Sequence, residues 1–202
     1  RGQADRHIRL LMGRPDARLE CVFLPSHVEA PNLPLTRDFG RVMGCDAVII
    51  ASPTPTHAEY LERLADFPGH ILLEKPAVST AVQTEALRRW PVERKRRTRI
   101  NFNFRFSPVV DALREVVGAP ATGDAIFWDV HTSHGLAFTP KYRDSWRGRE
   151  GQSLGVLETV GVHFVNLALM FFGRVRRSEG EFLWVAGRDG PPDTAVLRLW
   201  ME

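Results

Sequence analysis

The fold is decided by one stretch of the chain, Asp46-Ala-Val-Ile-Ile-Ala-Ser-Pro-Thr-Pro-Thr-His57. A short apolar run that ends at a proline is typical of a strand buried on both faces of a sheet. The next residues, 56–66, repeat apolar side chains at helical spacing and predict a helix. A second buried strand is predicted at His70–Glu74, and Lys75-Pro76 ends it. This alternation of strands and helices predicts a doubly wound parallel sheet, an α/β fold.

The segments on either side extend the pattern. A strand is expected at 18–24, and a capping box at 80–83 predicts a helix that runs to Trp90. Residues 100–106 alternate apolar and polar side chains, which predicts one more strand. Ser107-Pro108 predicts the start of a helix that ends at Gly118.

The pattern changes after Gly118. Residues 125–130 and 194–201 alternate like half-exposed antiparallel strands, and 155–172 read as a long helix. We therefore expect a parallel-sheet domain over residues 1–120 and an α+β domain over residues 121–202.

Composition excludes several classes of protein. The chain has 202 residues, of which 44% are hydrophobic and 25% charged, as in ordinary globular domains. Its two cysteines are too few for a disulfide scaffold and lack the paired spacing of a zinc site, so we expect free thiols in a reducing cytoplasm and no bound metal. The longest apolar stretch, 160–172, is too short and too polar to cross a bilayer. We expect a cytoplasmic protein with no membrane partner.

A basic run lies at 88–99, with seven arginine and lysine residues against one glutamate. Such a run can bind nucleic acid, but its only aromatic residue is Trp90. We therefore expect a solvated helix end and loop, and no nucleic acid among the partners. A phosphate-rich partner is the alternative.

Polar residues follow the predicted parallel strands at their carboxyl ends, where open α/β sheets bind ligands. They belong to 52–57, to 74–76 and to the polar face of 101–105. The ammonium of Lys75 could stabilise a developing alkoxide or polarise a carbonyl. The alternative is an ordinary surface lysine.

A second polar group lies on the predicted long helix. Thr159, His163 and Asn166 are spaced i, i+4 and i+7, so they share one face of an α-helix. Histidine is well suited to exchanging a proton near neutral pH. The alternative is a core histidine with a purely structural role.

These segments together resemble the glucose–fructose oxidoreductase / inositol dehydrogenase (Gfo/Idh/MocA) family. The strand and loop at 46–57 look like the family's, and Glu74-Lys75-Pro76 matches its E-K-P signature. Three further matches follow in the same order: the R-x-x-P strand exit at 105–108, the W-R pair at 146–147, and the D-x-G-x-H-x-x-D helix around Gly161-Val-His163.

The resemblance implies a Rossmann domain followed by a domain with an open, mostly antiparallel sheet. It implies NAD or NADP as cofactor, hydride transfer to or from a hydroxyl or carbonyl of a sugar-like or polyol substrate, and a homo-oligomer formed through the second-domain sheet. The residues fall into three groups: catalytic Lys75, His163 and Thr159; cofactor-binding Gly2, Ser52, Pro53, Thr54, His57, Glu74, Lys75, Trp146 and Arg147; and substrate-binding Asn103, Arg105 and Asn166.

The chain also departs from the family pattern. Thr159 stands where an aspartate would support the histidine. Glu158 is its neighbour in the sequence but would lie about 100° from Thr159 around an α-helix, so it is a poor substitute for that aspartate. Asn166 replaces the final acid of the motif. Leu24 stands where an acidic residue would bind the adenosine ribose, so NAD and NADP are not distinguished.

The glycine-rich phosphate turn is expected just before Gly2, so we expect a fragment at both ends. Two alternative functions stay open, namely a cofactor-binding sensor of the same fold and an NAD-dependent glycosidase.

Overall fold

The computed structural model describes residues 2–26, 30, 32–133, 135–149, 153–187 and 190–202. It divides into two compact units, residues 1–101 and residues 102–202. The sequence placed the domain boundary near residue 120, whereas the two units divide just after the last parallel strand. The helix that follows this strand therefore counts with the second unit.

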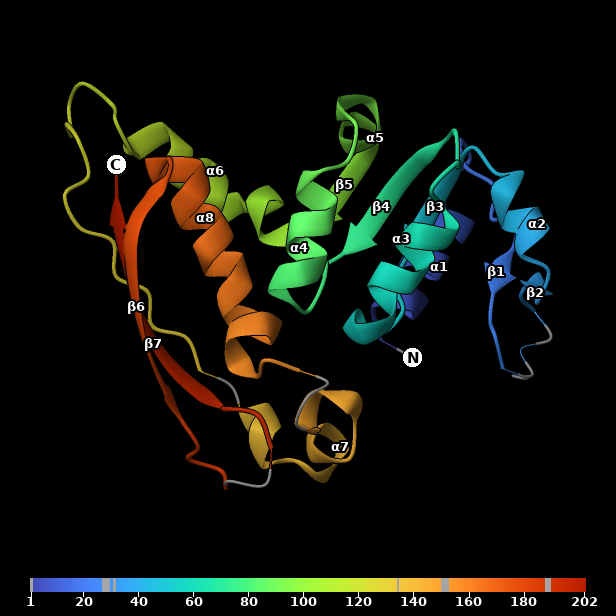
Figure 1. Cartoon of the computed structure of the whole chain (residues 1–202). Helices are drawn as coiled ribbons and strands as arrows, with labels where there is room; N and C mark the ends of the chain where they lie inside the picture. The colour runs from blue at the N-terminus through green and yellow to red at the C-terminus, as the bar shows by residue number, and fades with distance from the viewer. Residues whose placement is uncertain (1, 27–29, 31, 134, 150–152, 188–189) are drawn as a thin grey trace. The chain divides into compact units, whose positions relative to one another are not determined.

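The first unit alternates helices and strands, as the sequence predicts. In Figure 1 its elements run from blue to green. They are α1 (Gln3–Met12), β1 (Val22–Phe23), β2 (Leu35–Thr36), α2 (Phe39–Met43), β3 (Ala47–Ile50), the 3₁₀ turn η1 (Thr54–Thr56), α3 (His57–Arg63), β4 (His70–Glu74), α4 (Ala81–Arg88), α5 (Val92–Arg97) and β5 (Thr98–Asn101).

The strands β3, β4 and β5 form a parallel sheet in that order, and β1 pairs with β2 in a separate parallel pair. Ile50 lies opposite Leu73, and Glu74 lies opposite Asn101. The strands therefore end nearly level, and the polar residues that follow them reach the same edge. One apolar cluster forms the core of this unit: Val42, Ile50, Leu61, Leu64, Phe67, Ile71 and Leu73.

The local signals at two helix starts are confirmed. The hydroxyl of Thr80 accepts a hydrogen bond from the N–H of Gln83, and that of Ser107 accepts one from the N–H of Val110. Both bonds satisfy a first-turn N–H group that has no partner within the helix.

The second unit contains short turns, two longer helices and an antiparallel ribbon (Figure 1). Its elements are η2 (Asn103–Phe106), α6 (Pro108–Val116), η3 (Gly135–Phe138), α7 (Pro140–Arg143), η4 (Trp146–Gly148), the π-helical turn η5 (Leu157–Gly161), α8 (Val162–Phe172), β6 (Val175–Leu183) and β7 (Thr194–Met201). β6 and β7 are antiparallel, with Val175 opposite Met201 and Leu183 opposite Thr194. Within the described part of the chain, no helix has the length and hydropathy needed to span a membrane.

One expected strand is shorter than predicted, and another is absent. The strand predicted to reach residue 106 ends at Asn101, because the next residues close into a 3₁₀ turn in which the N–H of Arg105 donates to the carbonyl of Phe102. This turn places the ring of Phe104 flat on that of His163.

Residues 125–130 are also not a strand. No other strand pairs with them among the described residues, and Ile126 is 98% exposed. The packing of this segment comes from Trp128, whose ring lies 5.6 Å from that of Phe171 and 5.4 Å from that of Phe172.

Candidate functional site

In the first unit, the carboxyl ends of β3 and β4 carry the residues predicted to bind a cofactor. Thr54 is buried in the turn after β3, and the hydroxyl of Thr56 donates to that of Ser52 at 2.7 Å. Lys75 follows β4 directly and is joined to Pro76 by a cis peptide bond. Because β3 and β4 are parallel and in register, the two loops leave the sheet side by side.

His57 joins these two loops. Its ring is buried, with Nε2 lying 2.9 Å from the carbonyl oxygen of Ser52 and Nδ1 lying 3.0 Å from that of Pro76. The sequence predicted a cofactor contact for His57, and the structure gives both ring nitrogens partners inside the unit. Its contact with a cofactor stays a prediction.

Glu74 is a buried carboxylate among the predicted site residues. Its side chain is buried, and Oε1 lies 2.7 Å from Nε2 of His7 and accepts from Nδ2 of Asn101 at 2.8 Å. Burial alone would raise the pKa of this carboxyl, but the bonds to His7 and Asn101 outweigh it and hold the pKa below its ordinary value. Glu74 therefore connects α1, β4 and β5.

His7 was missed by the sequence reasoning. It lies in the first half of α1, 67 residues before Glu74 in the chain, and a lone histidine on an amphipathic helix gives no signal of its partner. Its bond to Glu74 brings the beginning of α1 to the carboxyl end of β4.

The start of α1 offers backbone donors to an anion. Gly2 precedes the helix with φ +127, a conformation that favours glycine, and no atom lies within 4 Å of where a Cβ would stand. No side chain of the described residues caps the helix, so its first N–H groups can bind an anion. The residues present fit a nicotinamide dinucleotide, whose phosphates would be held by these N–H groups.

In the second unit, η2 packs on α8 and surrounds His163. The imidazole is buried and stacks on Phe104, with ring centroids 4.1 Å apart and planes 12° apart, while Phe102 meets it edge-on at 6.3 Å. Nε of Arg105 donates to Oδ1 of Asn166 at 2.7 Å. Two of the three predicted substrate residues therefore bind each other, and the third, Asn103, is exposed beside them.

The helix that carries His163 is not α-helical at its start. The N–H of Val162 donates to the carbonyl of Leu157, five residues back, and the turn holds one extra residue. Glu158 and Thr159 both lie in this turn, and His163 follows it in α8. The angle of about 100° assumed an α-helix.

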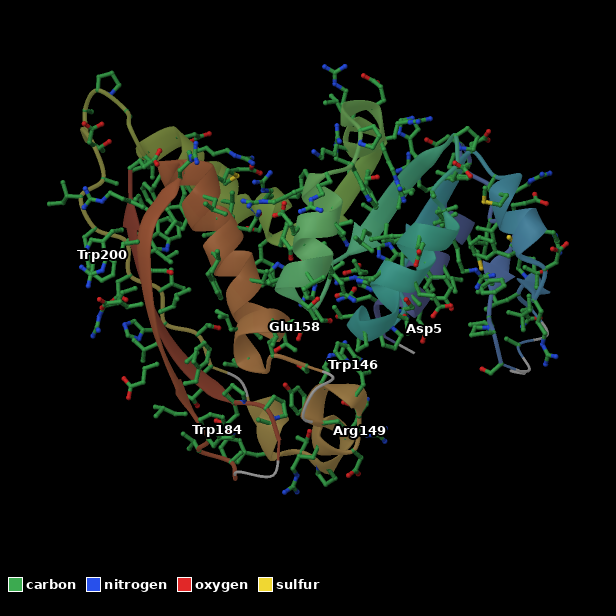
Figure 2. All side chains as sticks on the ribbon, in the orientation of Figure 1. Asp5, Trp146, Arg149, Glu158, Trp184 and Trp200 are labelled. Atoms are coloured by element: carbon green, nitrogen blue, oxygen red, sulfur yellow. The ribbon has the colours of Figure 1, made fainter. Side chains whose placement is uncertain are left out.

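Glu158 is a buried carboxylate that the sequence reasoning set aside. It is only 5% exposed and lies at the start of the helix, as Figure 2 shows. Oε2 accepts from the N–H of Leu154 at 2.6 Å, whereas Oε1 has no hydrogen-bond partner among the described residues. A buried charge with a spare acceptor is costly unless a further group satisfies it, so Glu158 is a candidate functional residue.

Thr159 uses its hydroxyl within the protein. Oγ1 donates to the carbonyl of Gly155 at 3.1 Å, and the side chain also shares a hydrogen bond with Tyr142. Burial raises the pKa of the Tyr142 phenol, although the bond to Thr159 opposes this shift. Thr159 thus fixes Tyr142 beside the helix, and its predicted catalytic role stays a prediction.

Trp146 and Arg147 form a compact pair in η4. The guanidinium of Arg147 lies 4.6 Å from the centre of the Trp146 ring, within the range of a cation–π contact. The N–H of Arg147 donates to the hydroxyl of Ser145, which closes the turn. Their contact with a cofactor stays a prediction.

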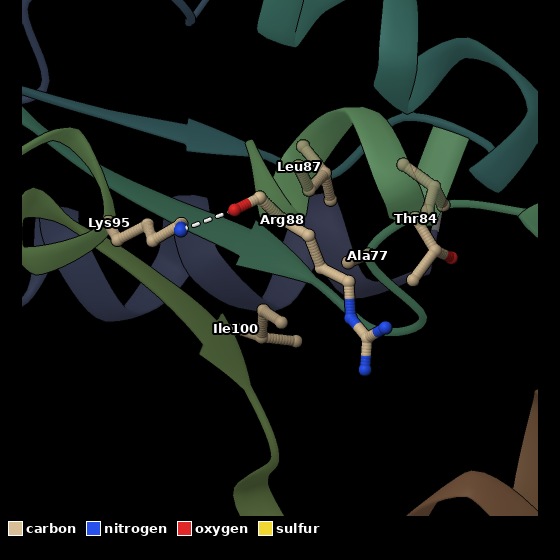
Figure 3. A pocket seen from close by; sticks show the side chains of 7 residues that line it. Ala77, Thr84, Leu87, Arg88, Lys95 and Ile100 are labelled. Carbon is tan, nitrogen blue, oxygen red and sulfur yellow. Dashed lines mark hydrogen bonds between the residues drawn. The ribbon is translucent and has the colours of Figure 1, made fainter. Parts of the chain in front are cut away.

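The basic run at 88–99 mostly binds backbone oxygens of its own unit. Arg94 donates to the carbonyl of Leu61 and lies over the ring of Trp90, and Arg99 donates to the carbonyl of Arg96 at the end of α5. Figure 3 shows Lys95 donating to the carbonyl of Arg88 at the rim of a shallow groove. None of the predicted site residues lines this groove, which is bordered by Ala77, Val78, Thr84, Leu87, Arg88, Lys95 and Ile100.

Comparison with known proteins identifies the class of the first unit. Residues 3–102 match the sequence model of an oxidoreductase family with an NAD-binding Rossmann fold, GFO_IDH_MocA. The first unit is therefore the Rossmann domain of an oxidoreductase, and its cofactor is NAD or NADP. The chain belongs to the Gfo/Idh/MocA family.

Individual relatives agree with this assignment. Over 138 residues the chain is 31% identical to a dTDP-3,4-didehydro-2,6-dideoxy-alpha-D-glucose 3-reductase of Streptomyces violaceoruber, covering 68% of this chain and 39% of that one. It is 24% identical over 128 residues to a scyllo-inositol 2-dehydrogenase (NADP(+)) of Bacillus subtilis, covering 63% and 35%. The chain thus spans little more than a third of these two relatives.

A solved structure shares the whole fold. A putative NADPH-dependent oxidoreductase from Desulfitobacterium hafniense matches all of this chain and 61% of its own, with a TM-score of 0.82 and 16% identity. At that identity the likeness supports the fold alone.

Proposed function

We propose that the protein is an NAD(P)-dependent dehydrogenase or reductase that acts on a hydroxyl or carbonyl group of a sugar-like or polyol substrate. Membership in the oxidoreductase family supports the redox chemistry. The names of two relatives, a deoxysugar reductase and an inositol dehydrogenase, support the class of substrate.

The observation that carries the proposal is the environment of His163. The imidazole is shielded between Phe104 and the helix, while the bonded pair Arg105 and Asn166 offers further polar atoms three residues along the helix. A shielded histidine beside groups that bind hydroxyls suits proton exchange with an alcohol.

Each residue then has a stated role. Bound nicotinamide accepts or supplies the hydride. His163 takes the proton of the substrate hydroxyl or returns it, and the ammonium of Lys75 stabilises negative charge on the substrate oxygen. Arg105, Asn103 and Asn166 bind substrate hydroxyls.

Glu158 is the positioning residue in this proposal. Its buried carboxylate lies in the π-helical turn that precedes α8, the helix of His163. A carboxylate there favours the protonated imidazole, which is the role that Thr159 cannot fill with a neutral hydroxyl.

The proposed cofactor contacts are completed by seven residues: Gly2, Ser52, Pro53, Thr54, Glu74, Trp146 and Arg147. We further propose that the ribbon of β6 and β7 is the surface for self-association, since apolar side chains such as Val196 and Phe182 are more than a third exposed on it.

The test is a panel of ketoses, inososes, aldoses and polyols, with NADH or NADPH oxidation and NAD or NADP reduction followed by absorbance. The proposal expects turnover with at least one member. Cofactor binding without turnover on any member would favour the sensor. Release of an aryl alcohol from an aryl glycoside, with no net change in the cofactor, would favour the glycosidase.

A further inference from the structure

His57 is a fully buried polar side chain of the first unit, with 1% of its surface exposed. It is the first residue of α3, directly after the turn η1, and its backbone N–H donates to the carbonyl of Thr54. A second bond closes the same turn, from the N–H of Thr56 to the carbonyl of Pro53 at 2.9 Å. The backbone that carries the imidazole is therefore held firmly by the loop after β3.

The ring of His57 reaches from this loop to the segment that follows Lys75. Its Nδ1 atom lies 3.0 Å from the carbonyl oxygen of Pro76 and 3.2 Å from that of Ala77, while Nε2 lies 2.9 Å from that of Ser52. Carbonyl oxygens only accept hydrogen bonds, so the ring is the donor, at both ends when it carries two protons and at one end when it is neutral. Both nitrogens face backbone of the same unit, and neither is left for a cofactor.

Lys75 lies between two anchored points of the chain. On its N-terminal side, Glu74 pairs with Asn101 in the sheet and accepts a hydrogen bond from its side chain. On its C-terminal side, the carbonyl of Pro76 is held by the ring of His57. The side chain of a lysine is a long, flexible stem, so the region that its ammonium can reach is set by the position of its backbone.

We propose that His57 is a positioning residue, which holds Lys75 in place through the contact of Nδ1 with the carbonyl of Pro76 and does not itself touch the cofactor. This inference rests on the proposed role of Lys75, whose ammonium stabilises negative charge on the substrate oxygen. A displacement of about 1 Å can cost about a hundredfold in rate. Loss of the Nδ1 contact is therefore expected to lower kcat and to leave cofactor binding unchanged.

Two single variants separate the two ends of the ring. In His57→Asn the side-chain amide can donate from the place of Nδ1, and in His57→Gln from that of Nε2. Urea unfolding gives the fraction of folded protein to which kcat is referred, with a substrate found in the panel. We expect His57→Asn to keep kcat within about threefold of wild type and His57→Gln to lose on the order of a hundredfold. The KM for the nicotinamide cofactor is expected to stay unchanged in both.

The reaction of Lys75 with trace acetic anhydride gives a readout that needs no turnover. Lys75 is half-buried, and peptide mass spectrometry compares its acetylation with that of exposed Lys141 in α7 of the second unit. We expect the ratio in His57→Asn to match that of wild type, and the ratio in His57→Gln to differ from both. If this difference is present while the wild type turns over no member of the panel, the proposed function fails and the positioning by His57 stands.

Several results would overturn the proposal. Equal acetylation ratios in all three proteins, or equal kcat per folded molecule in the two variants, would leave His57 with a purely structural role. A raised KM for the cofactor in both variants would show a cofactor contact instead. A His57→Asn variant that does not fold would also overturn the proposal, because the Nδ1 contact would then not suffice to hold the loop. If only His57→Gln fails to fold, the kcat and the acetylation ratio of His57→Asn decide, and both must match those of wild type.

Discussion

Asn101→Ala tests whether Glu74 holds the first unit together. The amide of Asn101 donates at 2.8 Å to a buried carboxylate, and hydrogen bonds to charged groups contribute about 1.5–3 kcal/mol. The variant removes one of the hydrogen bonds that Glu74 accepts, so we expect the free energy of unfolding of this unit to fall by about 2 kcal/mol. Asn103→Ala is the matched control, because Asn103 is exposed.

The loss has a characteristic dependence on pH. The pKa of Glu74 is held below its ordinary value, so the carboxylate stabilises the fold above that ordinary value, about 4.3, and the contribution is lost as the pH falls through the folded pKa. Removing Asn101 raises the folded pKa. The stability deficit of Asn101→Ala is therefore largest near neutral pH and shrinks in acid.

Urea unfolding at several pH values measures this, with hydrogen exchange of peptides from β4 and β5 to assign the change to the first unit. A deficit equal to that of Asn103→Ala, or one that does not change with pH, would refute the reasoning.

The sequence predicted the parallel sheet because its strands are continuous apolar runs. A run such as 47–50 predicts a buried strand whatever sequence surrounds it. It predicted the edge of the sheet at Lys75 for the same reason. It could not predict that His7 binds Glu74, since nothing in either residue's neighbourhood selects a partner 67 positions away.

Two failures came from assuming regular geometry. The alternation at 100–106 fits a strand, but residues 103–106 form a 3₁₀ turn whose Phe104 stacks on His163. The spacing of Thr159, His163 and Asn166 assumed 3.6 residues per turn throughout, whereas Thr159 lies in a π-helical turn.

Three further predictions concern the second unit. Glu158→Gln keeps an acceptor for the N–H of Leu154 but removes the negative charge. We therefore expect turnover to fall about tenfold and the rise of the pH–rate profile to move to lower pH. An unchanged pH–rate profile would count against the positioning role of Glu158. Thr159→Asp adds a carboxylate one turn before His163 and is expected to move the same rise to higher pH, as measured by steady-state kinetics. Asn166→Ala breaks the hydrogen bond to Arg105 and is expected to raise KM more than it lowers kcat. Phe106→Ala is the control, because Phe106 is exposed. Equal effects in both variants would contradict a substrate role for Arg105 and Asn166.

The central claim is that the protein transfers hydride between nicotinamide and a carbon of a sugar-like or polyol substrate. The most direct test uses NADH or NADPH deuterated at the transferring position of the ring, with a carbonyl substrate found in the panel, and mass spectrometry of the product. The account predicts one deuterium bound to the carbinol carbon of each product molecule, and a rate of transfer reduced on the order of a hundredfold in His163→Ala. A product without deuterium, or full activity in His163→Ala, would contradict it.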